Sequence, residues 1–407
     1  MLKKMLRRQV QSFVYRCLLR ELPKPYEHVA GYCWRSRLPT RRTAATASDL
    51  PDDSTLLLFE DQRYLGPPNS RRKHIEAIGR GWYCHADRSV YFSTADNTDP
   101  NDNQRDYAYS TSRWLHSRNS GAANNLLRRE TTDAAIARDV EYALGGMKYQ
   151  DICREVGIHG FVGESVLELG PGPSCGWALL LACRGADVTV VDPYPAIWDE
   201  SYHPAFFSAL LAAVGDLPDM NPTPIRDLLD DREFSARVIR RHNEPIEQSE
   251  LRGESFDIVF SNAVGEHFYD SAAAFRQLYR VTKPGGWGFH WIDFRDHRDF
   301  TSPLEYLLMS EAEFAREFGL RRGEIGNRLR ADEMSAIIER AGFEIVRREH
   351  TILADESYLK TFVPRLRNSA SSPYRDTSQE ELRVLGELVI IRRPDRFTPG
   401  AESRLSN

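Results

Sequence analysis

One segment constrains the fold of this chain more than any other: Ser165–Gly176, with the sequence SVLELGPGPSCG. Val166–Leu169 predicts a short buried strand, and the glycines that follow allow a tight turn with close approach of the backbone to a ligand. The apolar run Trp177–Arg184 predicts a helix whose N-terminus would lie beside that ligand. The segment therefore predicts a strand–loop–helix unit with a ligand site at its turn.

A second strand is predicted at Asp187–Val191, and it ends in Asp192. A carboxylate at the tip of the second strand of a βαβ unit can accept hydrogen bonds from both hydroxyls of a ribose. The two strands together predict a site for a nucleoside-containing cofactor.

Two cofactors compete for this geometry. A dinucleotide site has the spacing GxGxxG, but Gly170-Pro171-Gly172-Pro173 is followed by Gly176, one residue too late. A proline in the loop also removes an amide that could bind a pyrophosphate. Glu168, inside the first strand, is not needed for NAD and is typical of S-adenosylmethionine sites. The residues favour S-adenosylmethionine.

Four segments in order, VLELGPGPSCG, VVDP, SFDIVFSNAVGEHF and VTKPGGWGFH, resemble class I S-adenosylmethionine-dependent methyltransferases, over about residues 130–395. The resemblance implies a Rossmann-like three-layer α/β sandwich with a seven-stranded, mostly parallel sheet. It implies that Asp192 holds the ribose and that Glu168 fixes the loop. The glycines expected along the methionine part of the cofactor are Gly170, Gly172 and Gly176.

The resemblance also implies an adenine contact after the third strand and a residue facing the reacting centre after the fourth. Asn243 and Glu244 match the adenine position best, although this pair departs from the common acid–small pattern. Asn262 ends the predicted strand Phe256–Asn262 and is expected to face the reacting centre.

The candidate catalytic residues are Glu266 and His267 after the fourth strand, and His290 and Asp293 in the fifth. An alcohol acceptor needs a general base, and histidine suits that role because its pKa lies near neutral pH. Three interpretations of the segment HWIDFRDH stay open: a His/Asp base pair, a divalent metal held by Asp and His, or a strand end with Arg–Asp ion pairs. No ligand spacing indicates a metal site, and we predict no metal.

Two further segments have competing interpretations on the acceptor side. The insertion at about 194–236, with its apolar helix Phe206–Val214, is longer than ordinary α/β loops and predicts a lid or pocket wall, or a helix packed on its own domain. Asn327, Arg328 and Arg330 could contact acceptor hydroxyls or phosphate, or could cap the helix predicted at Asp332–Ala341.

The N-terminal segment is basic: residues 1–50 hold 11 Lys and Arg against 3 Asp and Glu, in a chain of net charge −5. Met1–Arg20 predicts an amphipathic helix, either a peripheral membrane anchor on anionic lipid or a helix packed on protein. No apolar run is long enough for a transmembrane helix, and the six cysteines never form CxxC. We expect a cytoplasmic protein that binds no nucleic acid, with a peripheral position at the inner face of the membrane as the alternative location.

A small β-rich module is predicted before the α/β domain, from short aromatic and β-branched segments such as Ser89–Ser93. The polar stretch Thr94–Tyr107 lacks the EF-hand pattern and predicts Asx turns. The module resembles one associated with bacterial surface-polysaccharide enzymes, which implies a glycan context. Its aromatic residues either stack on sugar rings or form the module's core: Trp82, Tyr83, Tyr91 and Tyr107.

The predicted organisation is a basic helix and linker (1–45), the β-rich module (46–125), the methyltransferase domain (126–395) and a flexible tail (396–407). The predicted reaction moves a methyl group from S-adenosylmethionine to a hydroxyl of a sugar or glycan. The alternatives are a methyltransferase for a lipid-like or polyketide acceptor, and a cofactor-free scaffold protein.

Overall fold

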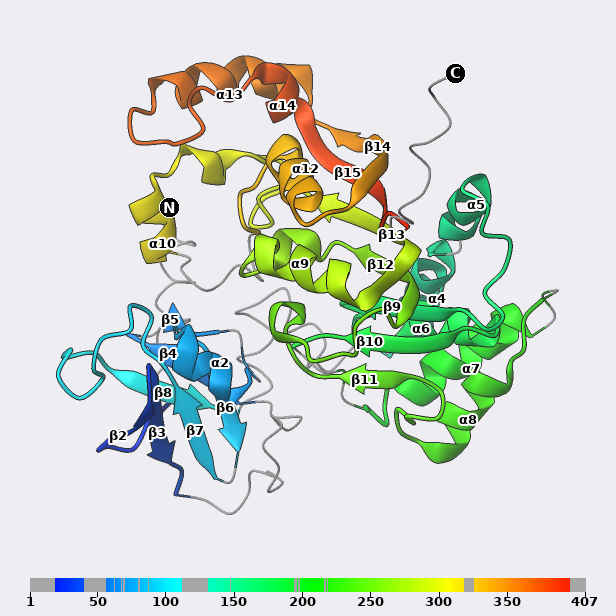
Figure 1. Cartoon of the computed structure of the whole chain (residues 1–407), viewed down its shortest axis with the longest axis horizontal. Helices are drawn as coiled ribbons and strands as arrows, with labels where there is room; N and C mark the ends of the chain where they lie inside the picture. Colours follow the sequence, from blue (N-terminus) through cyan, green and yellow to red (C-terminus); the bar gives the residue numbers. More distant parts are fainter. Residues whose placement is uncertain are drawn as a thin grey trace, which may run out of the picture.

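The computed structural model contains a β-rich module and a larger α/β domain (Figure 1). It describes residues 19–39, 56–111 except 62, 67, 69, 80 and 87, 131–146, 148–193, 196, 198–215, 217, 219–317 and 326–395. The predicted N-terminal helix (residues 1–18) and the tail from residue 396 lie outside the described residues, so membrane contact through residues 1–20 stays a prediction. Within the described ranges, no helix is both long and apolar enough to cross a membrane.

The α/β domain is built on a seven-stranded sheet with the strand order β11-β10-β9-β12-β13-β15-β14. Its first five members run parallel, and β15 is antiparallel to both of its neighbours. The predicted seven-stranded, mostly parallel sheet is confirmed. The strands are β9 (Ser165–Leu169), β10 (Asp187–Val191), β11 (Arg240–His242), β12 (Phe256–Asn262), β13 (Thr282–Asp293), β14 (Glu344–Leu353) and β15 (Val384–Arg392).

One face of the sheet is covered by helices from the first half of the domain (Figure 1). They are α4 (Asp133–Gly145), α5 (Lys148–Glu155), α6 (Gly176–Cys183), α7 (His203–Val214) and α8 (Thr223–Asp231). Alternate strand residues such as Val166 and Phe260 point toward these helices. Four apolar residues of α7 are fully buried in this layer: Phe206, Phe207, Leu210 and Val214.

This position corrects the prediction of a lid at 194–236. Helix α7 packs against α4 and α8, and α8 packs against α6, so both helices belong to the layer that covers the sheet. A mostly apolar helix such as α7 is suited to burial, and here it is buried against other helices of its own domain.

The other face is covered by α9 (Ser271–Val281) and α12 (Ala331–Arg340). Short 3₁₀ turns, η2 (Ile246–Gln248) and η3 (Gly265–His267), follow β11 and β12. A separate apolar cluster forms a cap from η4 (Glu305–Leu308), α10 (Glu311–Glu317), α13 (Glu356–Asn368) and α14 (Gln379–Arg383).

The β-rich module consists of two four-stranded sheets, β1-β8-β4-β5 and β2-β3-β7-β6, with helix α2 (Arg72–Ala77) packed against the second. The module begins earlier than the residue 46 predicted from the sequence, because β1, β2 and β3 lie within residues 20–37. The strands are β1 (Arg20–Glu21), β2 (Glu27–Ala30), β3 (Cys33–Arg37), β4 (Leu57–Glu60), β5 (Arg63–Tyr64), β6 (Tyr83–Ala86), β7 (Ser89–Phe92) and β8 (Tyr107–Ser110).

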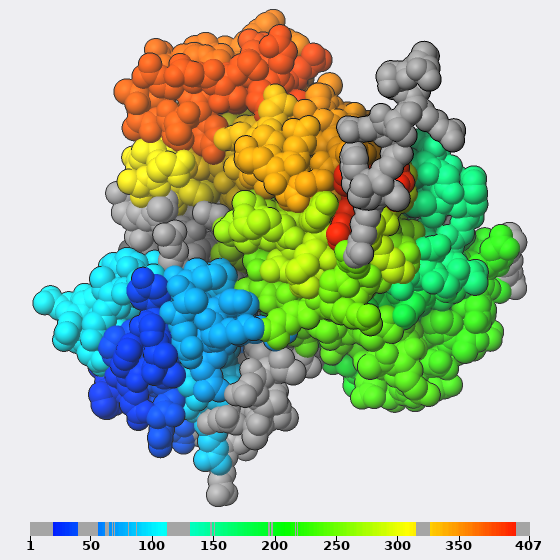
Figure 2. All heavy atoms as spheres, in the orientation of Figure 1, coloured from blue at the N-terminus to red at the C-terminus, as the bar shows by residue number. Residues whose placement is uncertain are grey.

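The four aromatic residues considered for sugar stacking lie in the module's interior. Trp82, Tyr83, Tyr91 and Tyr107 are at most 6% exposed, so none presents a ring face to a sugar. Of the two interpretations of these residues, the packing one is confirmed. The module's surface abuts the α/β domain beside the segment that follows β11 (Figure 2).

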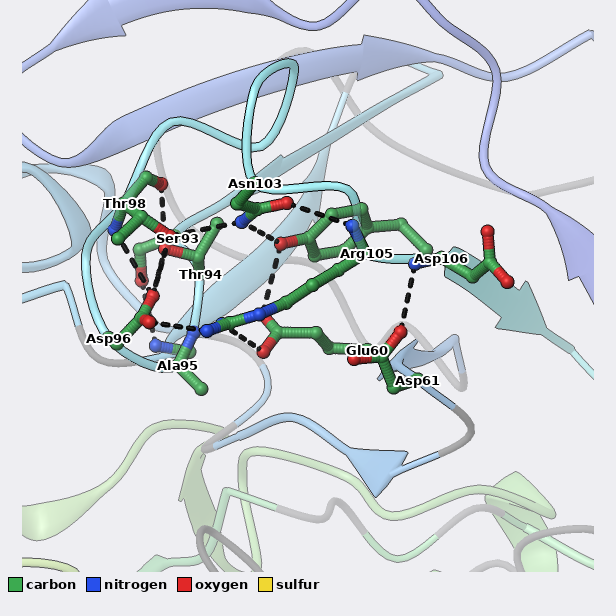
Figure 3. A network of polar contacts seen from close by, with 12 residues as sticks. Glu60, Asp61, Ser93, Thr94, Ala95, Asp96, Thr98, Asn103, Arg105 and Asp106 are labelled. Atoms are coloured by element: carbon green, nitrogen blue, oxygen red, sulfur yellow. Dashed lines mark hydrogen bonds and ion pairs between the residues drawn. The ribbon is translucent and has the colours of Figure 1, made fainter. Parts of the chain in front are cut away.

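The polar loop of the module is held by its own side chains (Figure 3). Asp96 accepts a hydrogen bond from the Thr98 N–H, and Asp99 accepts one from the Asn101 N–H, which confirms the predicted Asx turns. Arg105 bridges Asp96 and Glu60. Asp96 thus has a protein cation and a backbone donor as partners, and Asp99 has a backbone donor.

Candidate active site

A cavity of about 290 Å³ opens at the carboxyl ends of β9 and β12. In parallel α/β sheets this edge is where ligands bind. The loop after β9, the start of α6, helices α4 and α5 and the tip of β12 all contribute to it. The lining residues are Tyr142, Ala143, Gly145, Gly146, Tyr149, Glu168, Gly170, Pro171, Gly172, Ser174, Gly176, Trp177 and Asn262.

The glycine loop adopts a backbone that other residues rarely adopt. Gly170 and Gly172 have φ of +61° and +68°, in the left-handed region. A Cβ at Gly170 would lie 2.6 Å from Val264 Cγ2, whereas a Cβ at Gly172 would meet no atom within 4 Å. Gly176 allows close helix packing, because a Cβ there would lie 2.8 Å from the Cβ of Ala143. Two of the three predicted glycines therefore shape the turn, and the third brings α6 against α4.

Glu168 places a buried carboxylate at the floor of the cavity. Its side chain belongs to β9, is 6% exposed, and its Oε2 has no hydrogen-bond partner. Burial, with a smaller contribution from Asp192, raises the pKa of this carboxyl to about 8. A buried carboxylate with one unpaired oxygen beside a cavity is suited to a cationic ligand group.

Asn262 is held at the tip of β12 by two tyrosines that the sequence did not single out. Tyr149 donates to Asn262 Oδ1 and Asn262 Nδ2 donates to Tyr142, each at 2.9 Å. Both tyrosines come from α4 and α5, the helices before the first strand of the sheet. No local motif marks them, because their role depends on how these helices fold back over the cavity.

Asp192 and Asn243 follow neighbouring strands, β10 and β11. The Asp192 N–H donates to the carbonyl of His242 at 3.1 Å, which brings the two strand ends together. Their positions match those expected for ribose and adenine contacts, and those roles stay predictions.

Glu244 has a partner that the sequence did not indicate. Its Oε2 accepts a hydrogen bond of 2.7 Å from Nε of Arg71, which precedes α2 in the β-rich module. The Glu244 side chain is 6% exposed. This carboxylate is turned toward the module, so the structure does not support Glu244 as an adenine contact.

Glu266 and His267 lie on η3, one short turn beyond Asn262. The His267 Nε2 is 3.9 Å from Glu266 Oε1, and the His267 ring is 5.0 Å from the ring of His297. Burial raises the pKa of Glu266 well above its ordinary value. The structure thus brings two predicted residues together with His297, which was not in the predicted set.

Asp293 ends β13 beside this group. Arg295 donates to both of its oxygens, at 2.8 and 2.7 Å, and His297 Nε2 lies 3.6 Å away. Burial alone would raise the pKa of Asp293, but Arg295 and His297 lower it to about 2. This bidentate ion pair is the Arg–Asp contact that one sequence interpretation expected, and it leaves Asp293 a poor proton acceptor.

The candidacy of His290 as a base needs correction. Its side chain is 1% exposed, points toward α9 against Phe275, and does not line the cavity. Its Nδ1 shares a hydrogen bond of 2.8 Å with the Ser261 hydroxyl, and burial lowers its pKa to about 4. The alternation of β13 places His290 in the core, so it is a packed neutral histidine.

Comparison with known proteins identifies the family. The family model described as a methyltransferase domain matches residues 128–348, which is more than half of the chain. The chain belongs to this methyltransferase family. No curated protein matches this methyltransferase at a significant level.

Solved structures overlap with the methyltransferase at low scores. An S-adenosylmethionine-dependent methyltransferase from Mesorhizobium loti has 17% identity and a TM-score of 0.31, covering 57% of this chain and 93% of its own. One from Methanosarcina mazei has 15% identity and a TM-score of 0.34, with the same coverage. The strand order of the sheet, rather than these overlaps, identifies the fold.

The methyltransferase's cofactor is S-adenosylmethionine, and the cavity fits its methionine part. The unpaired Oε2 of Glu168 suits the ammonium of the methionine part, and the open space above Gly172 admits a ligand against the backbone. When bound, the cofactor supplies an electrophilic methyl group on sulfur.

The arginines considered for the acceptor instead hold the fold. Arg328 donates to the carbonyl of Met309, and Arg330 donates to the carbonyl of Phe294, each with a side chain almost fully buried. The Arg330 N–H also donates to Glu333 in a capping arrangement at α12. Asn327 donates to the carbonyl of Gly265 and thereby supports η3.

Proposed function

We propose that this methyltransferase transfers the methyl group to a hydroxyl oxygen of a sugar or glycan. The observation that carries the proposal is the polar group at the ends of β12 and β13, formed by Glu266, His267, Asp293 and His297. Its histidines are partly exposed, at 24% and 17% of their side chains. A polar, hydrated acceptor suits this environment better than an apolar one.

This group lies close to the cofactor loop. Val264, which follows β12, packs on Gly170 of that loop, and Glu266 and His267 come within the next three residues. An acceptor hydroxyl in this space must be held in line with the methyl group and must lose its proton as its oxygen attacks. His267 is the candidate proton acceptor, because His290 is enclosed in the core and Asp293 is paired with Arg295.

The alternatives have less support. A lipid-like or polyketide acceptor was linked to an apolar lid at Phe206–Val214, and that helix is buried in the domain's own core. A cofactor-free scaffold would not need the left-handed glycines or the unpaired acid at the cavity floor. The β-rich module's buried aromatic residues add nothing to the glycan assignment, which therefore rests on the polar group.

Calorimetric titration with S-adenosylhomocysteine tests the cofactor site first. Wild type should bind with micromolar affinity, and Asp192→Ala should bind at least about tenfold more weakly, because it removes a charged hydrogen-bond acceptor. Asp187→Ala is the matched control: it lies at the opposite end of β10, where it pairs with Arg240. Equal affinity in wild type and Asp192→Ala would contradict the ribose assignment.

The acceptor class is tested with isotope-labelled methyl groups. The enzyme is incubated with labelled S-adenosylmethionine and three panels: oligosaccharides and nucleotide sugars, fatty acyl compounds, and polyketides. Label should enter the first panel at oxygen and should be lost in His267→Ala. Label entering only the other panels would refute the sugar acceptor.

A further inference from the structure

The three side chains of Glu266, His267 and His297 form a compact group outside the cofactor cavity. Each offers an atom that can bind a metal, and these atoms all lie within 4.8 Å of one another. Two come from η3 at the end of β12, and the third from the loop after β13. The group therefore lies at the carboxyl edge of two adjacent parallel strands.

The Glu266 carboxylate has no hydrogen-bond partner among the described residues. Both of its oxygens are buried without a hydrogen bond, and Glu266 is only 2% exposed. Unsatisfied buried polar atoms cost free energy, and a carboxylate with two of them is unusual. Arg295 acts on Glu266 through its charge, and no hydrogen bond joins the two; its Nε and one terminal nitrogen donate to Asp293.

The surroundings hold the group in place. Asn327 donates to the carbonyl of Gly265 and to the hydroxyl of Ser271, which ties the start of η3 and the start of α9 to one side chain. Asp293 lies 3.6 Å from Nε2 of His297 and is fixed by Arg295. A carboxylate beside a metal-binding imidazole orients the ring and raises its basicity.

We propose that Glu266, His267 and His297 bind one divalent first-row transition-metal ion. Two imidazoles and one carboxylate are the ligand set that such ions accept, whereas Ca²⁺ and Mg²⁺ prefer oxygen ligands alone. Ligand atoms at about 2.1 Å from an ion lie about 3 to 3.5 Å apart. The partly exposed rings of His267 and His297 can close the remaining distance by rotation about their side-chain bonds.

This inference rests on the proposed function and refines it. Three protein ligands leave coordination positions open, and two of them match the adjacent oxygens of a vicinal diol, a common feature of sugars. The ion would orient the acceptor hydroxyl and lower its pKa, so that the proton would pass to solvent water as the oxygen takes the methyl group and S-adenosylhomocysteine leaves. His267 would then serve as a ligand instead of the proton acceptor. The proposal replaces the sequence prediction that no metal is required.

Metal titration of the full chain tests the site. Protein stripped with EDTA is titrated with Co²⁺ in visible absorption and with Mn²⁺ and Zn²⁺ by calorimetry. Wild type should bind one ion per chain, and Glu266→Gln and His297→Ala should each weaken binding at least about 100-fold. His159→Ala, in the exposed segment before β9, is the matched histidine control and should bind as wild type does.

The same samples are titrated with S-adenosylhomocysteine, and their folding is checked by thermal unfolding. If Glu266→Gln binds the ion as tightly as wild type does, the metal site is overturned and the proposed function is not. The same conclusion follows if wild type binds S-adenosylhomocysteine but no ion. Failure to bind S-adenosylhomocysteine in folded wild type overturns the proposed function. Because Glu266→Gln keeps the size of the side chain, it separates loss of the ligand charge from loss of the fold.

Discussion

At the residue scale, Glu168 combines burial with an unpaired oxygen beside the cavity. Its carboxyl has a pKa of about 8 in the folded protein and an ordinary value of 4.5. A group that holds its proton more tightly when folded contributes stability at low pH and loses that contribution as pH rises toward 8.

We therefore expect the unfolding free energy of the ligand-free wild type to fall between pH 5 and 8 more steeply than that of Glu168→Gln. The difference in slope should approach about 1.4 kcal/mol per pH unit, which corresponds to one proton. Urea unfolding across this range measures it. Saturating S-adenosylhomocysteine should reduce the difference, because its ammonium favours the carboxylate; equal slopes in the two ligand-free proteins would contradict the assignment.

His290 gives a contrasting residue-scale prediction. Replacing it with Ala removes a packed ring and leaves the Ser261 hydroxyl without its partner, so we expect a loss of about 2 to 4 kcal/mol in unfolding free energy. Because the side chain does not line the cavity, affinity for S-adenosylhomocysteine should stay within about twofold of wild type. If His290→Ala lost much of its affinity for S-adenosylhomocysteine and kept the stability of wild type, His290 would have to be part of the cofactor site.

At the scale of elements, His203 connects α7 to the glycine loop. Its Nδ1 accepts a hydrogen bond from the Asp199 N–H at 2.7 Å, which leaves Nε2 to donate to the carbonyl of Pro173 at 3.0 Å. The ring stacks on Trp198 and is 2% exposed. The insertion that was predicted as a lid therefore supports the cofactor loop from within the core.

His203→Phe should keep the stacking and lose both hydrogen bonds. We expect affinity for S-adenosylhomocysteine to fall about 3- to 10-fold, since each bond contributes about 1 kcal/mol and the loop it holds shapes the cavity. His159→Phe, at an exposed position, controls for the substitution itself. Calorimetry of both variants decides this, and unchanged affinity in His203→Phe would show that the loop holds its shape alone.

These elements also show which features could be predicted from sequence. The glycine loop and the position of Asp192 depend on strand and turn patterns within about 30 residues, and the sheet was predicted from such segments in order. The contacts of Glu244 with Arg71 and of Asn262 with Tyr142 join residues more than 100 positions apart, and no local pattern marks them. An apolar helix such as α7 suits a lid or a core equally, because its composition does not say what covers it.

At the scale of the whole molecule, the β-rich module holds the segment that follows β11. Besides the Arg71–Glu244 pair, Gln248 accepts from the Arg71 N–H at 3.2 Å, and its Nε2 donates to Ser70 at 3.3 Å. Glu250 pairs with both Arg71 and Lys73. This is the segment that the family resemblance assigns to adenine, so docking of the module and binding of the cofactor should be linked.

Arg71→Ala should therefore lower both stability and cofactor affinity. Removing the arginine leaves Glu244 as a buried charge, 6% exposed, without its partner, which should cost about 3 kcal/mol of unfolding free energy. The double variant Arg71→Ala, Glu244→Gln should recover part of that loss, because it removes the unpaired charge. Arg154→Ala, which breaks an exposed pair with Asp151, should cost less than about 0.5 kcal/mol and is the control. Calorimetry should show that Arg71→Ala binds S-adenosylhomocysteine several-fold more weakly than wild type, whereas Arg154→Ala binds it equally well. Equal affinities in the two variants would mean that docking of the module does not influence the cofactor site.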